Sequence, residues 1–573
     1  MMKNLRLQKK ISAWQIVFKL LCSVSFLLAV FVFLYPLFTV AVKCIAETGS
    51  GYKIAAVEST ASSGQAKLLR VACFTVYQAF LSALCATCFG LILSYFCAKK
   101  DFALRKFLLS LAAVPVAVPP LIMALSYVLF FGKAGILNSF RFLFFPEAKI
   151  HGSNFLYSFF AVILIHSFYN FPIALKTITN VWENEDSDLE HAAALLSNSK
   201  PRIFFKIILP ELFPALLSSF LLIFIYCFFS FLIILLFGGL GLSTLEVELY
   251  QVSRFSLHLI DSVKIALTEM LIAFFFVLLY IVSKLKSYKN AVESPTIKMR
   301  TKMNRTEKII YAICLVLCFF FLVFPICSIL LKSIFSFQVQ QTNADFFTRL
   351  KSFFTLDLSS WRILCSASTL RAIVNTIIVG VMTASFSVLC ALWINYREFK
   401  STLKDRERFL LKALPFVPLV ISPVVFGFAL RTSFSLQGKY ASNFLLLSLA
   451  QSCTAWTIAY TQINASFLQI PKSVMQASIL LSNNAFDAFC RTILPLLKTG
   501  IGSGFAFCFA ISAGDASLPL MLRIPQFQNL SLMILRLSGA YRFSESSVLA
   551  FVLIIIVILN FLLTSKNTKR ENL

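Results

Sequence analysis

Residues 308–333 read KIIYAICLVLCFFFLVFPICSILLKS, an apolar run with no charged side chain between Ile309 and Leu331. A helix of about 20 such residues is long enough to cross the roughly 30 Å of hydrocarbon in a bilayer. Hydrocarbon offers no hydrogen-bond partner to the backbone, so a segment of this kind crosses it as a helix. The run therefore predicts a membrane protein built from α-helices.

Before and after this run, similar apolar runs fill most of the chain. Of the 573 residues, 59% are hydrophobic and only 13% are charged, which is too little charge to cover a soluble surface. We expect an all-α polytopic membrane protein with about 12 transmembrane helices. Their expected limits are 15–42, 69–97, 107–131, 154–179, 210–238, 263–283, 308–333, 370–395, 409–431, 443–467, 496–522 and 546–564.

The segment before the opening run, residues 285–307, is polar and rich in Lys and Arg, and it reads as a flexible cytoplasmic connector. It separates a first six-helix half, residues 1–284, from a second, residues 308–573. The formal charge of +27 comes largely from short links and the termini, which twelve spans would put on one side. The positive-inside rule makes that side the cytoplasm, with both termini there. This bias explains the charge without nucleic acid as a partner.

One sequence element occurs in both halves. Residues 191–210 read HAAALLSNSKPRIFFKIILP and residues 476–495 read QASILLSNNAFDAFCRTILP, and nine of the twenty positions match at an offset of 285. Both copies follow an expected span, the fourth and the tenth, on the cytoplasmic side. In each copy an apolar stretch meets a Ser-Asn pair, which favours turns, and a proline then opens the next span. The pattern predicts two homologous halves, each presenting two short helices to a cytosolic partner.

This element resembles the EAA loop of ABC importer permeases, in which Glu-Ala-Ala and a later Gly precede a Leu-Pro. Both copies depart from the family pattern, because His or Gln replaces the signature glutamate and Ser replaces the glycine. The residues that the resemblance assigns to ATPase coupling are Glu190, His191, Ala192, Ala193, Ser197, Pro210, Gln476, Ala477, Ser478, Ser482 and Pro495.

Over nearly its whole length, the chain resembles the fused two-half permeases of ferric-iron and thiamine importers. The resemblance implies a non-enzymatic translocation subunit in the bacterial cytoplasmic (inner) membrane, which moves a small solute inward by alternating access. Two cytoplasmic ABC ATPase subunits and an extracytoplasmic solute-binding protein would be its partners. The chain has no GxxxxGK[ST] motif, so we expect ATP on the partners and no cofactor here. The segments TLEVELYQ (244–251) and SGAYRFSESSVLA (538–550) favour thiamine over ferric iron as the solute.

Prolines inside two expected spans mark a possible path. Prolines break helical hydrogen bonds, and kinked helices either line a path or only pack. A carboxyl group inside a span either lines the path or caps a helix. The possible path residues are Pro115, Pro119, Pro120, Pro418, Pro423 and Asp515.

The alternative function is a secondary active transporter with internal repeats, which would need buried ionisable groups for coupling. Candidates for this role are His166, Glu269 and Asp515, although Glu269 is expected to pair with Lys264. Cys85 and Cys88 form a CxxC, which is the spacing of a zinc or redox motif, but no second pair follows at ligand spacing and the surrounding run is apolar. The four histidines form no cluster either, so we expect no metal site.

Overall fold

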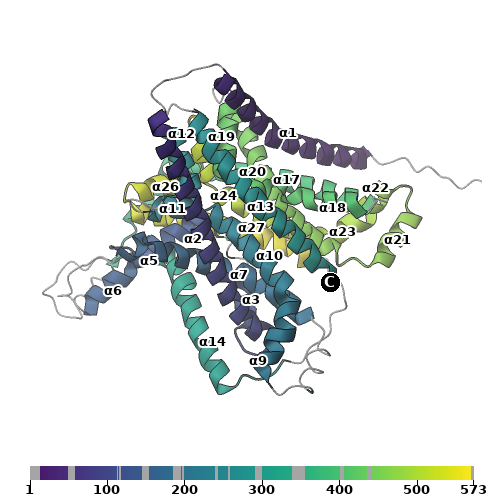
Figure 1. The fold of residues 1–573 in the computed structure, drawn as a ribbon, viewed down its shortest axis with the longest axis horizontal. Coiled ribbons are helices and arrows are strands. Elements are labelled where there is room, and N and C mark those ends of the chain that lie inside the picture. Colours follow the sequence, from purple (N-terminus) through teal and green to yellow (C-terminus); the bar gives the residue numbers. More distant parts are fainter. Residues whose placement is uncertain are drawn as a thin grey trace, which may run out of the picture.

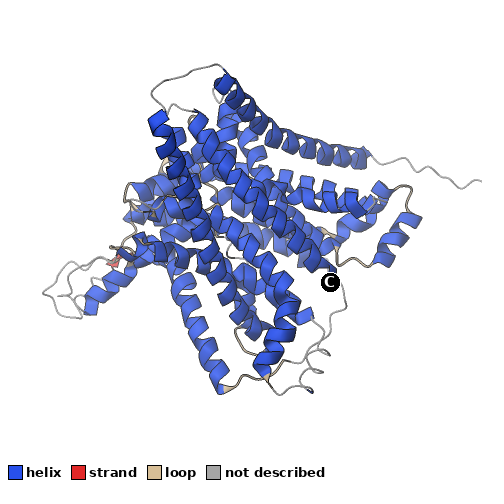
Figure 2. Ribbon diagram, viewed as in Figure 1, coloured by secondary structure: helices blue, strands red, loops and turns tan. Residues whose placement is uncertain are grey.

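The computed structural model describes most of the chain. The described residues are 13–49, 58–111, 114, 118–144, 154–184, 195, 199–238, 243–255, 259–290, 300–337, 355–400, 405–434 and 440–569. Helices account for nearly all of the regular structure in these ranges, as expected, and one antiparallel pairing of two short strands completes it (Figures 1 and 2).

The elements of the first half run from residue 13 to residue 290. They are α1 (Ala13–Gly49), α2 (Glu58–Lys99), α3 (Arg105–Ser110), α5 (Pro120–Phe131), α6 (Ile136–Phe144), η2 (Asn154–Tyr157), α7 (Phe159–Asn184), α9 (Lys200–Ile203), η3 (Phe204–Ile208), α10 (Leu209–Phe228), α11 (Phe231–Phe237), α12 (Leu245–Phe255) and α13 (Leu259–Asn290).

The second half begins at residue 305. Its elements are α14 (Arg305–Cys318), η4 (Phe319–Val323), α15 (Phe324–Ile334), β1 (Phe335–Ser336), β2 (Thr355–Leu356), η5 (Ser359–Cys365), α17 (Ala367–Lys400), α18 (Asp405–Ala413), η6 (Leu414–Val420), α19 (Pro423–Ser433), α20 (Tyr440–Phe467), α21 (Lys472–Leu481), α22 (Ala485–Ala488), η7 (Phe489–Ile493), α23 (Leu494–Leu496), α24 (Lys498–Gly514), α25 (Ser517–Leu522), α26 (Leu530–Gly539) and α27 (Phe543–Lys569).

The number of helices that can span a membrane is close to the expected twelve. Within the described ranges, nine helices are long and apolar enough to cross, or up to eleven if each of two bent pairs is one span. One pair, Phe409–Val420 and Pro423–Ser433, bends by 82° at the Ser-Pro step. The remaining expected span forms the 28-residue helix α20, which is not among the nine. Buried polar residues such as Gln451 and Asn464 lower its apolar character.

The two halves repeat in structure as well as in sequence. The π-helical turns Phe204–Ile208 and Phe489–Ile493 begin 285 residues apart, and so do α12 and α26. The same offset relates α7 to α20, α10 to α24 and α13 to α27 to within a few residues. A single offset thus relates five pairs of elements, which extends the repeat well beyond the cytoplasmic link.

The first span of each half packs against the other half. Helix α1 packs against α17, α19 and α20 of the second half (Figure 1), where Phe26 stacks on Trp456 with ring centroids 5.8 Å apart. In return, α14, η4 and α15 pack against α2, α7 and α5 of the first half, where Tyr127 donates a hydrogen bond to the carbonyl of Phe321. The two halves are therefore interlocked.

The end of the basic connector is held to the first half. Thr301 forms an isolated parallel bridge with Lys100, and Arg300 pairs with Glu183 at 3.1 Å. Residues 291–299 lie outside the described residues, whereas α13 continues to residue 290, and residues 300 and 301 contact the first half before α14 begins. Helix α13 therefore runs past the expected boundary at residue 284, and the expectation of a flexible connector stays a prediction.

Candidate functional site

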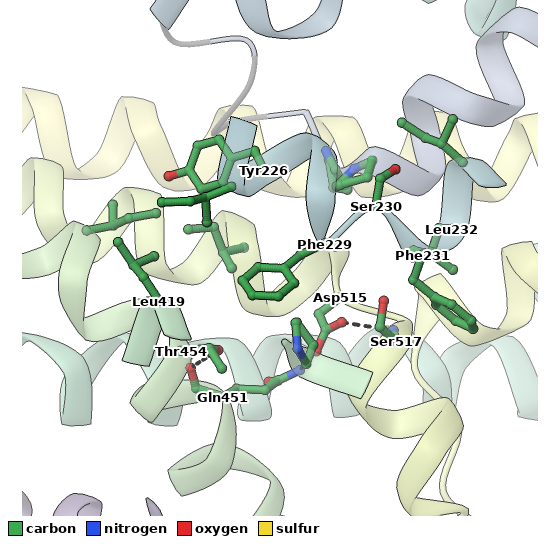
Figure 3. A pocket seen from close by; sticks show the side chains of 18 of the residues that line it. Tyr226, Phe229, Ser230, Phe231, Leu232, Leu419, Gln451, Thr454, Asp515 and Ser517 are labelled. Atoms are coloured by element: carbon green, nitrogen blue, oxygen red, sulfur yellow. Dashed lines mark hydrogen bonds between the residues drawn. The ribbon is translucent and has the colours of Figure 1, made fainter. Parts of the chain in front are cut away.

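A cavity of about 260 Å³ lies where the two halves meet. On one side its wall is made from the start of α5, the middle of α7 and the break between α10 and α11. On the other side it is made from the break between η6 and α19, the middle of α20 and the break between α24 and α25. Most of the lining side chains are apolar or aromatic (Figure 3). Irregular backbone is tolerated at membrane depth where it lines such a cavity, so the broken helices mark a candidate site for a solute.

The structure brings together five of the six path residues predicted from the sequence. Pro119, Pro120, Pro418, Pro423 and Asp515 all line this cavity, whereas Pro115 lies outside the described residues. Two of the prolines, Pro120 and Pro423, stand in the first turns of α5 and α19, where a missing N–H costs little. These two prolines therefore begin new helices at the cavity rather than kink continuous ones.

The halves touch at the edge of the cavity. Helix α24 ends at Gly514, and a Cβ atom added there would lie 2.0 Å from Cγ of Pro119. Only a residue without a side chain allows the end of α24 to approach the start of α5 so closely. Gly514 thus marks a contact on which the present arrangement of the two halves depends.

Asp515 forms a polar cluster on the wall from the second half. Its Oδ1 atom accepts hydrogen bonds from the backbone N–H groups of Ser517 at 2.9 Å and Leu518 at 3.3 Å. Its Oδ2 atom accepts one from Nε2 of Gln451 at 3.0 Å, and Ser512 donates to Oε1 of Gln451 at 2.6 Å. Asp515 thus caps α25 and also faces the cavity, so the two sequence interpretations do not exclude each other.

His166 forms the matching cluster on the wall from the first half. Its Nδ1 atom lies 2.8 Å from Nε2 of Gln78, and its Nε2 atom lies 2.7 Å from Oγ of Ser230. His166 and Ser230 stand 285 residues before Gln451 and Asp515, so the two clusters occupy equivalent positions of the repeat. The sequence interpretation missed Ser230 and Gln451. Extending the offset of the cytoplasmic repeat upstream and downstream would have found both.

The second copy of the cytoplasmic repeat forms the predicted pair of short helices. Helix α21 holds Gln476, Ala477 and Ser478, a turn begins at Ser482, and α22 and η7 lead to Pro495. Figure 1 shows α21 at the edge of the molecule, apart from the packed helices. The side chains of Leu480 and Leu481 at its end are 84% and 88% exposed, which leaves a large apolar surface without a cover within the described residues.

The first copy is largely outside the described residues. Glu190, His191, Ala192, Ala193 and Ser197 all fall there, whereas Pro210 stands in the first turn of α10. The side chain of Leu195 is described and is 90% exposed, as at the equivalent Leu480.

A buried carboxylate anchors the second copy of the cytoplasmic repeat to neighbouring helices. Asp487 in α22 accepts a hydrogen bond from Nε2 of Gln15 in α1 at 2.9 Å and pairs with Nε of Arg491 at 2.6 Å. Beside it, the rings of Phe486 and Tyr396 meet edge to face. The element is therefore fixed to α1 and α17, so its movement would be passed to both helices.

We expect Asp487→Ala to lower the stability of the purified protein by about 1–3 kcal/mol, because it removes hydrogen bonds to a buried charged group. Thermal unfolding in detergent measures this loss. Asp261→Ala is the matched control, because Asp261 is exposed. It forms an ion pair with Lys264 at 3.6 Å, and exposed ion pairs contribute little to stability. Equal unfolding temperatures for the two variants would contradict the anchoring role of Asp487.

The expected pairing of Glu269 with Lys264 is wrong. Lys264 pairs with Asp261 instead. Glu269 lies one turn deeper in α13, 1% exposed, next to the equally buried carboxyl group of Glu246 in α12. The helix repeat explains the difference, because residues 261 and 264 share a helix face near the end of α13, whereas residue 269 faces inward.

Comparisons with known proteins agree with this architecture. Residues 89–287 match the family described as binding-protein-dependent transport system inner membrane component. The chain is 23% identical over 495 residues to the thiamine transport system permease protein of Brucella abortus, over 85% of each chain. It is also 23% identical over 500 residues to the protein of the same name in Haemophilus influenzae, over 84% of this chain and 86% of that one. To the ferric transport system permease protein of Actinobacillus pleuropneumoniae it is 22% identical over 465 residues, which is 78% of this chain and 63% of that one.

Proposed function

We propose that this chain, a fused two-half inner-membrane permease of the binding-protein-dependent ABC importers, moves thiamine inward by alternating access. Its relatives support the importer class rather than the secondary transporter, which would have a similar multi-pass helical architecture. Alternating access needs two states in which the halves are packed differently. The cavity between two interlocked halves supports such a motion.

Energy for the motion would come from two cytoplasmic ATPase subunits, one on each copy of the repeated element. Exposed leucines on α21 support this role, because a contiguous apolar surface on a soluble face marks a partner site. The chain itself lacks a phosphate-binding loop of the P-loop type. We therefore infer that ATP binds to the partners and that this chain carries no cofactor.

An extracytoplasmic solute-binding protein would deliver the solute to the opposite face. The basic links and termini support an orientation with both ends in the cytoplasm. In this orientation, α21 and the repeated elements face the ATPases, and α6 with the β1–β2 pairing faces the binding protein.

The lining of the central cavity is the observation that favours thiamine over ferric iron. Tyr226, Phe229 and a single carboxylate, Asp515, line it, a combination that suits an aromatic cation. A hard metal cation is instead held by several oxygen ligands. Within the described ranges, no group of three or more His, Cys, Asp or Glu side chains could hold a metal ion.

The solute is tested by reconstituting the permease with its cognate ATPase and binding protein in liposomes. We expect binding protein loaded with thiamine to stimulate ATP hydrolysis, and binding protein offered ferric iron to leave it at the basal rate. Stimulation by ferric iron alone would reverse the assignment of the solute. Uptake driven by an ion gradient without ATP would contradict the importer mechanism itself.

A further inference from the structure

The two equivalent positions at the helix breaks differ in charge. Ser230 lies between α10 and α11, and Asp515 lies 285 residues later, between α24 and α25. The serine hydroxyl is neutral and contacts the ring of His166. Asp515 is the only carboxylate among the described residues that line the cavity. A passage between two similar halves therefore carries a negative charge on one wall only.

Capping of α25 does not require this charge. The backbone donors of Ser517 and Leu518 bind Oδ1, and Ser, Thr or Asn side chains satisfy such donors equally well. The second oxygen, Oδ2, accepts a hydrogen bond from Gln451. A carboxylate oxygen has room for a second donor, and Asp515 is only half-buried because it borders the cavity.

No protein cation neutralises this carboxylate within the described part of the chain. Neither Lys nor Arg lines the cavity there, and Asp515 takes part in no ion pair. A carboxylate at a water-poor site is stabilised by a nearby positive charge. With walls of low polarity around it, the charge also focuses its field into the cavity. The cavity should therefore attract cations and repel anions.

Aromatic rings oppose the carboxylate. Figure 3 shows Phe229 between the wall that carries Tyr226 and Ser230 and the wall that carries Gln451 and Asp515. Tyr169 and Phe231 also line the cavity. Aromatic faces attract positive charge and pack on flat rings, so the lining suits a cation whose charge is spread over a ring.

We propose that the permease itself holds a binding site for a flat organic cation, in which Asp515 faces the positive charge and Phe229 packs against the ring. This site rests on the proposed import of thiamine, whose thiazolium ring is such a cation. The neutral pair of Ser230 and His166 lies on the facing wall, so the bound cation has one preferred orientation.

The test is binding of labelled thiamine to the purified permease–ATPase complex without its binding protein. The competitor is the neutral isostere of thiamine in which carbon replaces the charged ring nitrogen. We expect the wild-type complex to prefer the cation by about tenfold or more. Asp515→Asn keeps an oxygen to cap α25 but removes the charge, and it should weaken thiamine binding about tenfold and abolish most of the preference.

Asp261→Asn is the matched control, because it removes an exposed carboxylate outside the cavity, and it should retain the preference. If the Asp515→Asn complex does not assemble, the competition between thiamine and its isostere on the wild-type complex is the test. Equal affinity of the wild type for the two compounds would contradict the proposed site. Two outcomes contradict this site but leave the proposed function intact. In the first, the wild type takes up thiamine normally but shows no preference for the cation. In the second, Asp515→Asn shows the same preference as the wild type. Failure of the complete wild-type system to take up thiamine contradicts the proposed function instead.

Discussion

Replacing Leu481 with aspartate should detach an ATPase subunit from the second half and reduce uptake about 30-fold or more, the effect of losing an interface hot spot. Leu481 is the last residue of α21, and 88% of its side chain is exposed. The substitution should therefore not disturb packing within the permease. In a complex, an aspartate there would be buried without a partner. The measurements are co-purification of the ATPase with the tagged permease and uptake in proteoliposomes.

Leu358→Asp is the matched control, because Leu358 follows β2 and is 59% exposed. The predicted orientation puts it on the extracytoplasmic side, so co-purification of the ATPase should not change. Normal ATPase binding by Leu481→Asp would mean that α21 is not a docking element. The same charge at Ala477, also exposed on α21, should act in the same direction without preventing insertion into the membrane.

Gly514→Ala is expected to cost about 1–3 kcal/mol of stability and most of the transport activity, because it overpacks the contact between the halves. The added Cβ would lie 2.0 Å from Cγ and 2.3 Å from Cβ of Pro119, so the end of α24 or the start of α5 must move. Thermal unfolding and thiamine uptake measure the two effects.

Gly539→Ala is a suitable control, because no atom lies within 4 Å of a Cβ added there, apart from its chain neighbours and the backbone of its own helix. Gly539 ends α26, and exchanging glycine for alanine in a helix is neutral or stabilises by about 0.5–1 kcal/mol. If Gly514→Ala matches wild type in stability and uptake, the halves do not depend on this contact.

Local pattern was sufficient to predict most of the fold. Each of the twelve apolar runs contains helix, because a membrane-spanning segment must satisfy its own backbone hydrogen bonds. The runs could not predict where these helices stop. Breaks at Ser422–Pro423 and Asp515–Ala516 depend on neighbouring helices that take over the freed polar groups, as Gln451 does for Asp515.

The exchange of first spans could not be predicted from the sequence. An apolar helix such as α1 is compatible with packing on either half, because its buried and its exposed sides both carry apolar residues. Its position depends on distant partners, such as Trp456 for Phe26 and Asp487 for Gln15. These contacts join residues more than 400 positions apart and leave no periodic signal in the chain.

Only some residues of the candidate site could be predicted from the sequence. Prolines and Asp515 were recognisable because they are unusual inside apolar runs. Ser230 and Gln451 are ordinary in such runs, and only their common offset of 285 from the other half reveals them. The functional difference between the walls, a carboxylate against a hydroxyl, appears when both clusters are seen around one cavity (Figure 3).

The stoichiometry of the assembled transporter tests most directly whether two fused halves work as one ATP-driven permease. Native mass spectrometry of the complex purified through a tag on this chain measures it. We predict one copy of this chain with two ATPase subunits, reduced to one ATPase by Leu481→Asp. A wild-type complex that holds a single ATPase subunit, or two copies of this chain, would contradict two coupling elements on one polypeptide.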